Sequence, residues 1–436
     1  MEVCPFRGIR YNQGIVGGLA QVICPPYDVI TPEQQKLYYE KNDYNAIRLE
    51  YPLTDSSQQS AVSSNDKYNR AANTFKQWLK QGILQIDGVS SFYLHDHYFD
   101  YLGKKRMRRG LIARVKLEPW GNGIYPHEET FSKAKDDRLQ LMRACRANFS
   151  PLFSLYQDSE QKIASMLAEA SQAKPIMSFN PSPLTGEGQG GGGEKHVVWA
   201  ITAPELQQQI KRSLATQPLY VADGHHRYET ALAYQQEFAR RANTIGRILD
   251  KSIEFAPKAH YIMMELVDFS DPGLVVLPIH RLVRGISPSV LAKLRKQLEN
   301  FFILESVPLK ADSCLAVLGL ESQSLVVLKP RQDVSLGAMM HGNRSKVYRS
   351  LAISLLNHVI LDKVLSGAKD LDIVYVVSAT EAYQQIKEGK YQLAFLLDSP
   401  QPKVVKVIAD AKDRMPRKST YFYPKLPAGL IINPLD

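Results

Sequence analysis

The run Asp223-Gly224-His225-His226-Arg227 combines side chains that bind phosphates with a backbone pattern that suits them. Residues 218–222 are apolar and predict a buried strand, Asp-Gly is a turn signal, and a helical pattern begins at His225. The start of a helix presents unpaired backbone N–H groups, and its dipole favours negative charge. An arginine can grip a phosphate with two parallel hydrogen bonds. The sequence therefore predicts an anion-binding turn.

A structural interpretation of the same run is simpler. Gly224 would only permit the turn, Asp223 would only cap the helix, and Arg227 would be a solvated surface charge. Two adjacent histidines and an arginine behind an Asp-Gly turn favour the functional interpretation. In that interpretation Asp223 and His226 are catalytic candidates, whereas the anion is bound by Gly224, His225, His226 and Arg227.

Three other places in the chain carry candidate chemistry. His127 and Glu128 precede a helix predicted over 136–146, and could provide a general base or hold Mg²⁺; helix capping is the alternative. Arg281 and Lys418 are candidates for a second phosphate clamp, with surface charge or strand-end capping as the alternative.

No set of residues has a recognised metal-ligand spacing, so no metal site is predicted. Two groups of histidines could still come together: His95 and His97 would face the same side of one strand, and His280 could join the adjacent His225 and His226.

The elements that must position these residues alternate between strands and helices, which predicts an α/β (α+β) class with mixed sheets and flanking helices. A Gly-rich segment at 181–195 reads as a flexible linker or loop. We therefore expect an N-terminal α+β domain over 1–180 and an α/β domain over 196–436 that carries the anion-binding turn. Two prolines make the segment 23–30 stiff, so it is either the wall of a site or a structural corner.

Composition and charge narrow the function classes. The chain has 436 residues and a net charge of +10, with 44% hydrophobic residues. No apolar run approaches the ~20 residues of a membrane span, and residues 1–6 do not resemble a signal peptide, so a cytoplasmic protein with no membrane partner is expected. The densest basic cluster, 104–109, is predicted at the tip of a hairpin, either solvated or forming a basic lip beside a nucleotide site.

Six segments in order resemble a bacterial and archaeal family catalogued as domain of unknown function one-thousand-fifteen. The resemblance covers essentially the whole chain and is carried by residues 6–11, 25–30, 127–130, 223–232, 277–282 and 415–426. The family name implies no activity.

The Asp223–Arg227 run is also similar to the Gly-centred box of the ParB/sulfiredoxin-like fold, which opens a helix and holds nucleotide phosphates. This resemblance implies a ParB/sulfiredoxin-like core in the C-terminal part, phosphate contacts from residues 224–227, and Asp223 as a turn or metal neighbour. Sulfiredoxin has a cysteine directly before its Gly-His-Arg, and this chain does not. Partition proteins have a DNA-reading helix-turn-helix after the box, and none is recognisable here.

The leading hypothesis is a phosphotransferase that uses a nucleotide, ATP or ADP with or without Mg²⁺, and acts on a small metabolite. The alternative is a ParB-like regulatory or nucleic-acid-binding module without turnover. A hydrolase with His127 or His226 as its base lacks a recognisable nucleophile. The sequence also leads us to expect that Arg227→Ala abolishes nucleotide binding with little effect on thermal stability.

Overall fold

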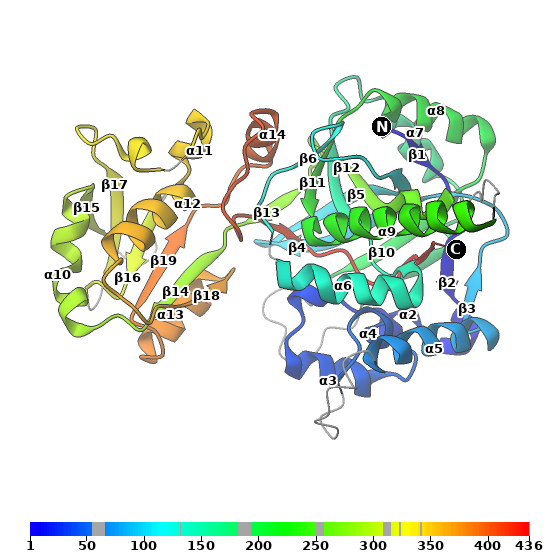
Figure 1. The fold of residues 1–436 in the computed structure, drawn as a ribbon, viewed down its shortest axis with the longest axis horizontal. Coiled ribbons are helices and arrows are strands. Elements are labelled where there is room, and N and C mark those ends of the chain that lie inside the picture. Colours follow the sequence, from blue (N-terminus) through cyan, green and yellow to red (C-terminus); the bar gives the residue numbers. More distant parts are fainter. Residues whose placement is uncertain are drawn as a thin grey trace. The chain divides into compact units, whose positions relative to one another are not determined.

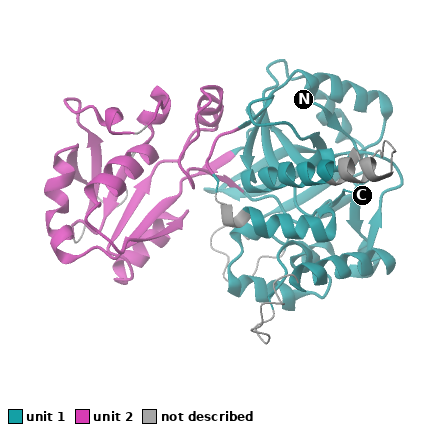
Figure 2. Ribbon diagram, viewed as in Figure 1, with its two compact units in different colours: residues 1–125, 130–274, 424–436 teal, residues 126–129, 275–423 magenta. Residues whose placement is uncertain are grey.

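The computed structural model describes residues 1–54, 66–130, 132–181, 193–249, 257–307, 315–321, 324–340 and 342–435. The chain divides into two compact units (Figure 2). Unit 1 comprises residues 1–125, 130–274 and 424–436, and unit 2 comprises residues 126–129 and 275–423. Each unit combines sheets with helices, so the predicted α/β class with mixed sheets and flanking helices is confirmed.

Unit 1 is built on a nine-stranded mixed sheet (Figure 1). Its path runs β6-β11-β8-β12-β5-β4-β10-β9, with β1 added beside β5. Strands β12 and β8 are parallel, whereas β11 pairs antiparallel with β8, and the neighbours from β12 through β5, β4 and β10 to β9, as well as β1 and β5, are antiparallel. The strands are β1 (Val3–Cys4), β4 (Phe92–Tyr101), β5 (Lys104–Lys116), β6 (Ile124–Pro126), β8 (Leu152–Tyr156), β9 (Met177–Phe179), β10 (Lys195–Ile201), β11 (Leu219–Asp223) and β12 (Tyr261–Asp268). Two small ribbons pair β2 (Ile9–Tyr11) with β3 (Leu84–Ile86), and β7 (Ala147–Asn148) with β21 (Asn433–Pro434).

The large sheet has an apolar core on each face. Alternate residues of a strand point to opposite faces, so Leu94 and Tyr93 belong to different cores. Helices α7 (Lys162–Ala170), α8 (Pro204–Ala215) and α9 (His225–Leu249) contribute to one core. The short helices α1 (Gln13–Val16) and α2 (Leu19–Val22), with α5 (Asp66–Lys80), contribute to the other. Helix α6 (Ser132–Cys145) contributes to both.

Two further helices of unit 1 show how local sequence sets an element's bounds. Helix α3 (Pro32–Lys41) starts at a capping box in which Thr31 and Gln34 exchange side-chain and backbone hydrogen bonds, and a proline fits its first turn. Helix α4 (Ile47–Glu50) is one turn long and almost entirely buried. Its buried end places the Glu50 carboxylate inside the unit.

The structure divides the chain elsewhere than the expected boundary at 181–195. Strands β9 and β10, on either side of that segment, pair antiparallel in the same sheet, so both belong to unit 1. Residues 182–192 lie outside the described part of the chain. Unit 2 instead begins near residue 275, takes in 126–129 from far back in the sequence, and returns the chain to unit 1 at Pro424.

Unit 2 contains a six-stranded antiparallel sheet in the order β15-β17-β16-β19-β14-β18, and a separate ribbon of β13 and β20. Its strands are β13 (Val275–Leu277), β14 (His280–Arg284), β15 (Phe302–Val307), β16 (Leu315–Leu318), β17 (Leu325–Pro330), β18 (Asp372–Val376), β19 (Leu393–Leu397) and β20 (Tyr421–Tyr423). Its helices are α10 (Pro288–Glu299), α11 (Lys346–Ser350), α12 (Ala352–Leu355), a π-helix (Leu356–Val364), α13 (Ala379–Lys387) and α14 (Pro402–Asp410). Across the described ranges, neither unit has a helix with the length and apolar character to cross a bilayer.

Candidate functional site

The predicted strand, turn and helix around Asp223 are all present in unit 1. Strand β11 ends at Asp223, Gly224 makes the turn with φ +92°, and α9 starts at His225. The register of β11 against β8 shifts between Val221 and Asp223, a bulge that re-aims the strand just before the turn. The backbone N–H of Tyr228 donates to the Gly224 carbonyl at 3.0 Å, which closes the first helical turn.

A side chain at position 224 would be strained for two reasons. The left-handed φ disfavours any residue with a Cβ, and that Cβ would lie 3.0 Å from both Leu152 Cγ and Arg227 Nη2. We expect Gly224→Ala to lower the free energy of unfolding by about 1–3 kcal/mol, measured by urea denaturation. Gly103→Ala is the matched control, since Gly103 has φ +71° but open space around its Cβ position. Equal losses in the two variants would show that contact with Arg227 and Leu152 contributes nothing.

The Arg227 side chain points into unit 1 and is nine-tenths buried. Its Nη1 donates to Ser150 Oγ at 2.7 Å and to the Pro151 carbonyl at 2.9 Å, and its Nη2 lies 4.0 Å from Asp223 Oδ2. Arg227 is therefore not the solvated surface charge that the structural interpretation predicts. Its guanidinium is also not held out to solvent, as it would be in a simple phosphate clamp.

The residue that joins Arg227 to a wider network is Glu50, at the end of α4. Ser150 Oγ donates to Glu50 Oε1 at 3.0 Å, so one hydroxyl bridges the carboxylate and the guanidinium. Glu50 is 3% exposed. Burial raises the pKa of Glu50 above its ordinary value, and the charges of Arg138 and Arg227 oppose this without cancelling it. Such a carboxyl group can take up and release a proton at a pH closer to neutral.

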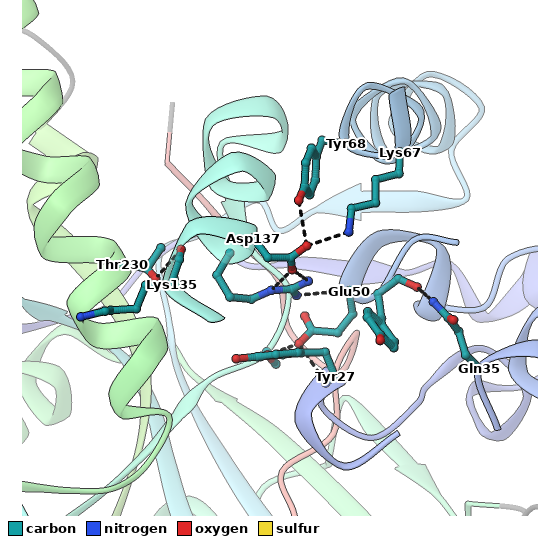
Figure 3. Close-up of polar contacts among 11 residues, drawn as sticks. Tyr27, Gln35, Glu50, Lys67, Tyr68, Lys135, Asp137 and Thr230 are labelled. Atoms are coloured by element: carbon teal, nitrogen blue, oxygen red, sulfur yellow. Dashed lines mark hydrogen bonds and ion pairs between the residues drawn. The ribbon is translucent and has the colours of Figure 1, made fainter. Parts of the chain in front are cut away.

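A second acidic centre lies beside Glu50 (Figure 3). Tyr68 and Lys67 converge on Asp137 Oδ1 at 2.8 and 2.7 Å, and Arg138 Nε donates to Oδ2 at 3.0 Å. Burial raises the pKa of Asp137, but the charge of Arg138 and the hydrogen bonds to this carboxylate outweigh it, so the net shift is downward. Asp137 therefore stays ionised and holds Arg138 in place.

Arg138 connects this acidic centre with the proline-rich segment. Its Nη1 donates to the backbone carbonyl of Glu50 at 2.6 Å, and its guanidinium lies 4.0 Å from the centroid of the Tyr27 ring. The Tyr27 N–H faces Glu50 Oε1 at 3.5 Å. Through Tyr27 the segment 23–30 thus packs against Arg138 and Glu50, while its role as the wall of a functional site stays a prediction.

A small cavity of about 40 Å³ lies among these groups. Glu50, Arg138, Ser150 and Arg227 are among its polar lining residues, and Leu141, Leu152 and Ile262 are among its apolar ones. A cavity of this size holds a few water-sized groups rather than a whole nucleotide. We call Glu50, Ser150, Arg227 and Arg138 the Glu50 cluster.

Asp223, His225 and His226 are the remaining predicted residues of the turn. Asp223 Oδ2 is 3.1 Å from Lys425 Nζ. Burial raises the pKa of Asp223, yet the charges of Lys425 and Arg227 outweigh it and lower that pKa overall. His225 is buried, with its ring centroid 6.3 Å from that of Trp120, and His226 is half-buried. The turn thus holds one ionised carboxylate between two cations, with a histidine partly open to solvent.

The other four predicted site residues gather in unit 2, around the turn 415–420. His127 is fully buried, and its Nε2 lies 2.9 Å from Thr420 Oγ1. The Glu128 carboxylate accepts the backbone N–H groups of Lys418 and Ser419 at 2.6 and 3.3 Å.

Arg281 acts on the same turn by donating to the carbonyl of Lys418 at 2.7 Å. Lys418 itself is exposed, with φ +57°. Three of the four residues therefore fasten this turn, a role closer to the capping alternatives; their catalytic and clamping roles stay predictions.

The basic cluster 104–109 lies on strand β5 after the hairpin turn, rather than at a fully solvated tip. Arg108 is completely buried, and Arg109 makes a bidentate pair with Asp96 at 2.7 and 2.6 Å. Lys104 and Lys105 are exposed. Much of the charge that would attract nucleic acid is thus neutralised inside the unit.

Sequence reasoning identified Arg227 and the segment 23–30, but it missed Glu50, Arg138, Ser150 and Lys425. A weak signal existed for Glu50, because a carboxylate between Leu49 and Tyr51-Pro52 lies in an apolar stretch. Ser150 and Lys425 carry no local signal, since their partners lie 77 and 202 positions away in the sequence.

A family model described as "Protein of unknown function (DUF1015)" matches residues 3–363. The chain belongs to this family. The predicted resemblance to it is therefore confirmed, while the ParB/sulfiredoxin-like resemblance of the 223–227 turn stays a prediction. No curated protein matches the chain.

Several solved structures are weakly similar to this DUF1015 chain. Free serine kinase mutants in complex with AMP and with ADP are 11% identical, cover 71% of this chain and 86% or 87% of their own, and have a TM-score of 0.35. A conserved hypothetical protein from Pyrococcus furiosus is 12% identical over 73% of this chain and 93% of its own, with a TM-score of 0.34. C-terminally truncated SbnI from Staphylococcus aureus is 8% identical over 72% and 84%, with a TM-score of 0.33. These likenesses are too weak to assign a fold or an activity.

Proposed function

We propose that this chain binds the phosphates of a nucleotide, ATP or ADP, at the turn between β11 and α9 and transfers a phosphoryl group to a small hydroxyl-bearing metabolite. The observation that carries the proposal is the bridge from Glu50 through Ser150 to Arg227, three residues that also line one small cavity. A carboxylate that can accept a proton and a fixed guanidinium are thereby held on either side of the Ser150 hydroxyl. Phosphoryl transfer requires this combination of positioning and charge neutralisation.

In the proposed reaction Glu50 is the general base. The acceptor hydroxyl gives its proton to the Glu50 carboxylate while its oxygen bonds to the terminal phosphorus, and the bond from that phosphorus to the bridging oxygen breaks. The nucleotide leaves with one phosphate fewer, and the product is a phosphate monoester. The raised pKa of Glu50 suits a base that must both accept and release a proton near neutral pH.

The start of α9 would supply the phosphate contacts. Its N-terminal backbone and the side chains of His225 and His226 lie next to Gly224, where the helix dipole favours an anion. Asp223, kept ionised by Lys425, would ligate a Mg²⁺ that arrives with the phosphates. His127, Glu128, Arg281 and Lys418 belong to unit 2, and their catalytic and phosphate-binding roles stay predictions.

A thermal-shift screen of the full chain with AMP, ADP and ATP, each with and without Mg²⁺, tests the proposal. A ligand that binds only the folded state at 100 times its dissociation constant adds about 2.7 kcal/mol of stability. We expect one of these nucleotides to raise the melting temperature, and His226→Gln to remove the rise. His260→Gln is the control, because His260 is exposed and bonds to Gln235 instead. Failure of every nucleotide, or an equal rise in the His226 variant, would refute binding at this turn.

The alternative of a nucleic-acid-binding module receives less support. Its main support was the basic cluster 104–109 on β5. Within that cluster, however, Arg108 is buried and Arg109 is paired with Asp96. Binding through phosphates would weaken steeply with added salt.

A further inference from the structure

Three imidazoles lie together inside unit 1, away from the Glu50 cluster. His95, His97 and His196 are 0%, 0% and 3% exposed, and one ring nitrogen of each lies within 4.8 Å of the other two. His95 Nε2 is 2.9 Å from His196 Nδ1, and the ring centroids of His97 and His196 are 4.1 Å apart. Burying three rings of this polarity next to one another is costly unless something binds their nitrogens.

Strand register builds the cluster. His97 on β4 lies directly opposite His196 on β10, and residues paired in this way share one face of the sheet. Across β5, His95 lies opposite Gly110. The missing side chain at Gly110 leaves room for Glu265 of β12 to reach past β5, because a Cβ there would lie 2.4 Å from Glu265 Oε1. Glu265 Oε2 thereby meets His95 Nδ1 at 2.9 Å.

A carboxylate that holds the far nitrogen of a histidine is the arrangement that orients histidine ligands at metal centres. Here it fixes the Nδ1 proton of His95 toward Glu265 and turns the Nε2 lone pair toward His196. The second oxygen of Glu265, Oε1, is buried and has no hydrogen-bond partner among the described residues.

The charged side chains around the three rings are of both signs. Arg108 is the positive charge, with Nη2 at 3.4 Å from His97 Nδ1. Two carboxylates face the same rings: Glu265 on His95 and Glu194 at 3.3 Å from His97 Nε2.

We propose that His95, His97 and His196 bind one divalent transition-metal ion of the Zn²⁺ type. Imidazole nitrogens ligate Zn²⁺ at about 2.0–2.1 Å, which places them about 3.3 Å apart in a tetrahedral site, so the rings need only small movements. Glu194 lies at the rim of the cluster, with a partly exposed side chain, and marks the side from which the ion enters. The ion would tie β4 to β10 through their side chains as well as their backbones.

The test uses the full chain, stripped with a chelator and then titrated with Zn²⁺ or Co²⁺. We expect one ion per chain by mass spectrometry of metal content, a rise in melting temperature, and a Co²⁺ absorption spectrum of nitrogen ligation. His97→Asn should abolish binding, whereas His260→Gln should retain it. Glu265→Gln, which keeps the ring contact but removes the charge, should weaken binding about 10–100-fold.

Two results would overturn the proposal. One is a correctly folded chain that retains no Zn²⁺ or Co²⁺ after titration, which would make the cluster a self-contained hydrogen-bond network. The other is metal bound with equal affinity by the wild type and the His97 variant. If His97→Asn does not fold, Glu265→Gln and the Co²⁺ spectrum of the wild type still decide between these outcomes. None of these measurements depends on nucleotide binding at the 223–227 turn.

Discussion

Arg227→Ala is expected to lower the free energy of unfolding by about 3 kcal/mol and, in the same variant, to remove any nucleotide-induced rise in melting temperature. The guanidinium is nine-tenths buried and donates to Ser150 and to the Pro151 carbonyl. Removing it leaves a buried carbonyl and hydroxyl short of a donor. It also takes away one of the two cations that favour the ionised form of Glu50.

This expectation corrects the one drawn from the sequence, in which Arg227 was a ligand contact whose loss would hardly affect stability. The same side chain now has a structural role in addition to its proposed functional one. Urea denaturation of the wild type, Arg227→Ala and Arg227→Lys gives the stability difference. Arg212→Ala, an exposed arginine on α8, is the matched control and should change stability by less than about 0.5 kcal/mol.

Arg227→Lys separates the two roles. A lysine retains the charge near Glu50 but cannot make the two hydrogen bonds from one planar group. We expect an intermediate stability and a weakened nucleotide response. A wild-type stability for Arg227→Ala would mean that Ser150 and Pro151 find other partners, and that the network around Glu50 does not depend on this residue.

The sequence predicts the parts of the site that are set by local chemistry. Strand β11, the turn at Gly224 and the start of α9 follow from apolar runs, an Asp-Gly pair and helical periodicity within 30 residues. The capping box before α3 follows in the same way from Thr31 and Gln34. Patterns of this kind depend only on residues close together in the sequence, so they can be recognised without knowledge of the fold.

What the sequence does not predict depends on long-range pairing. Glu50 meets Ser150 100 positions later, and Asp223 meets Lys425 after the chain has left unit 1 and returned to it. The division into units was missed for a related reason. A Gly-rich composition indicates a connection without a packed core, but it does not distinguish a domain boundary from a loop between the adjacent strands β9 and β10.

Glu50→Gln should separate catalysis from stability. Glutamine keeps the shape of the side chain and can still bond to Ser150, but it cannot accept the proton of an acceptor hydroxyl. Loss of a general base costs about 10²–10⁴-fold in rate. We therefore expect the rate of phosphoryl transfer to fall by that factor, while the variant still binds the nucleotide that the thermal-shift screen identifies.

The direction of the pKa shift predicts the effect on stability. Because the pKa of Glu50 is raised in the folded state, folding favours the protonated form, and the stability gained from that preference is present below the unfolded pKa and lost as pH rises through the folded value. A glutamine at position 50 is always neutral, so the variant does not lose this stability as the pH rises. Melting temperatures measured from pH 4 to pH 8 should thus show Glu50→Gln at least as stable as the wild type at the upper end, with the difference shrinking toward pH 4.

The pH–rate profile provides the decisive readout. In the wild type, kcat should fall on the acid side as Glu50 takes up a proton, at a pH above the ordinary range of a glutamate. In Glu50→Gln the residual rate should lose that acid limb. A residue that only supports the fold would instead lower the melting temperature and leave the shape of the profile unchanged. If Glu50→Gln melts early and keeps the wild-type profile, Glu50 is a structural carboxylate, and the base of the proposed reaction must be sought at Asp223 or His226.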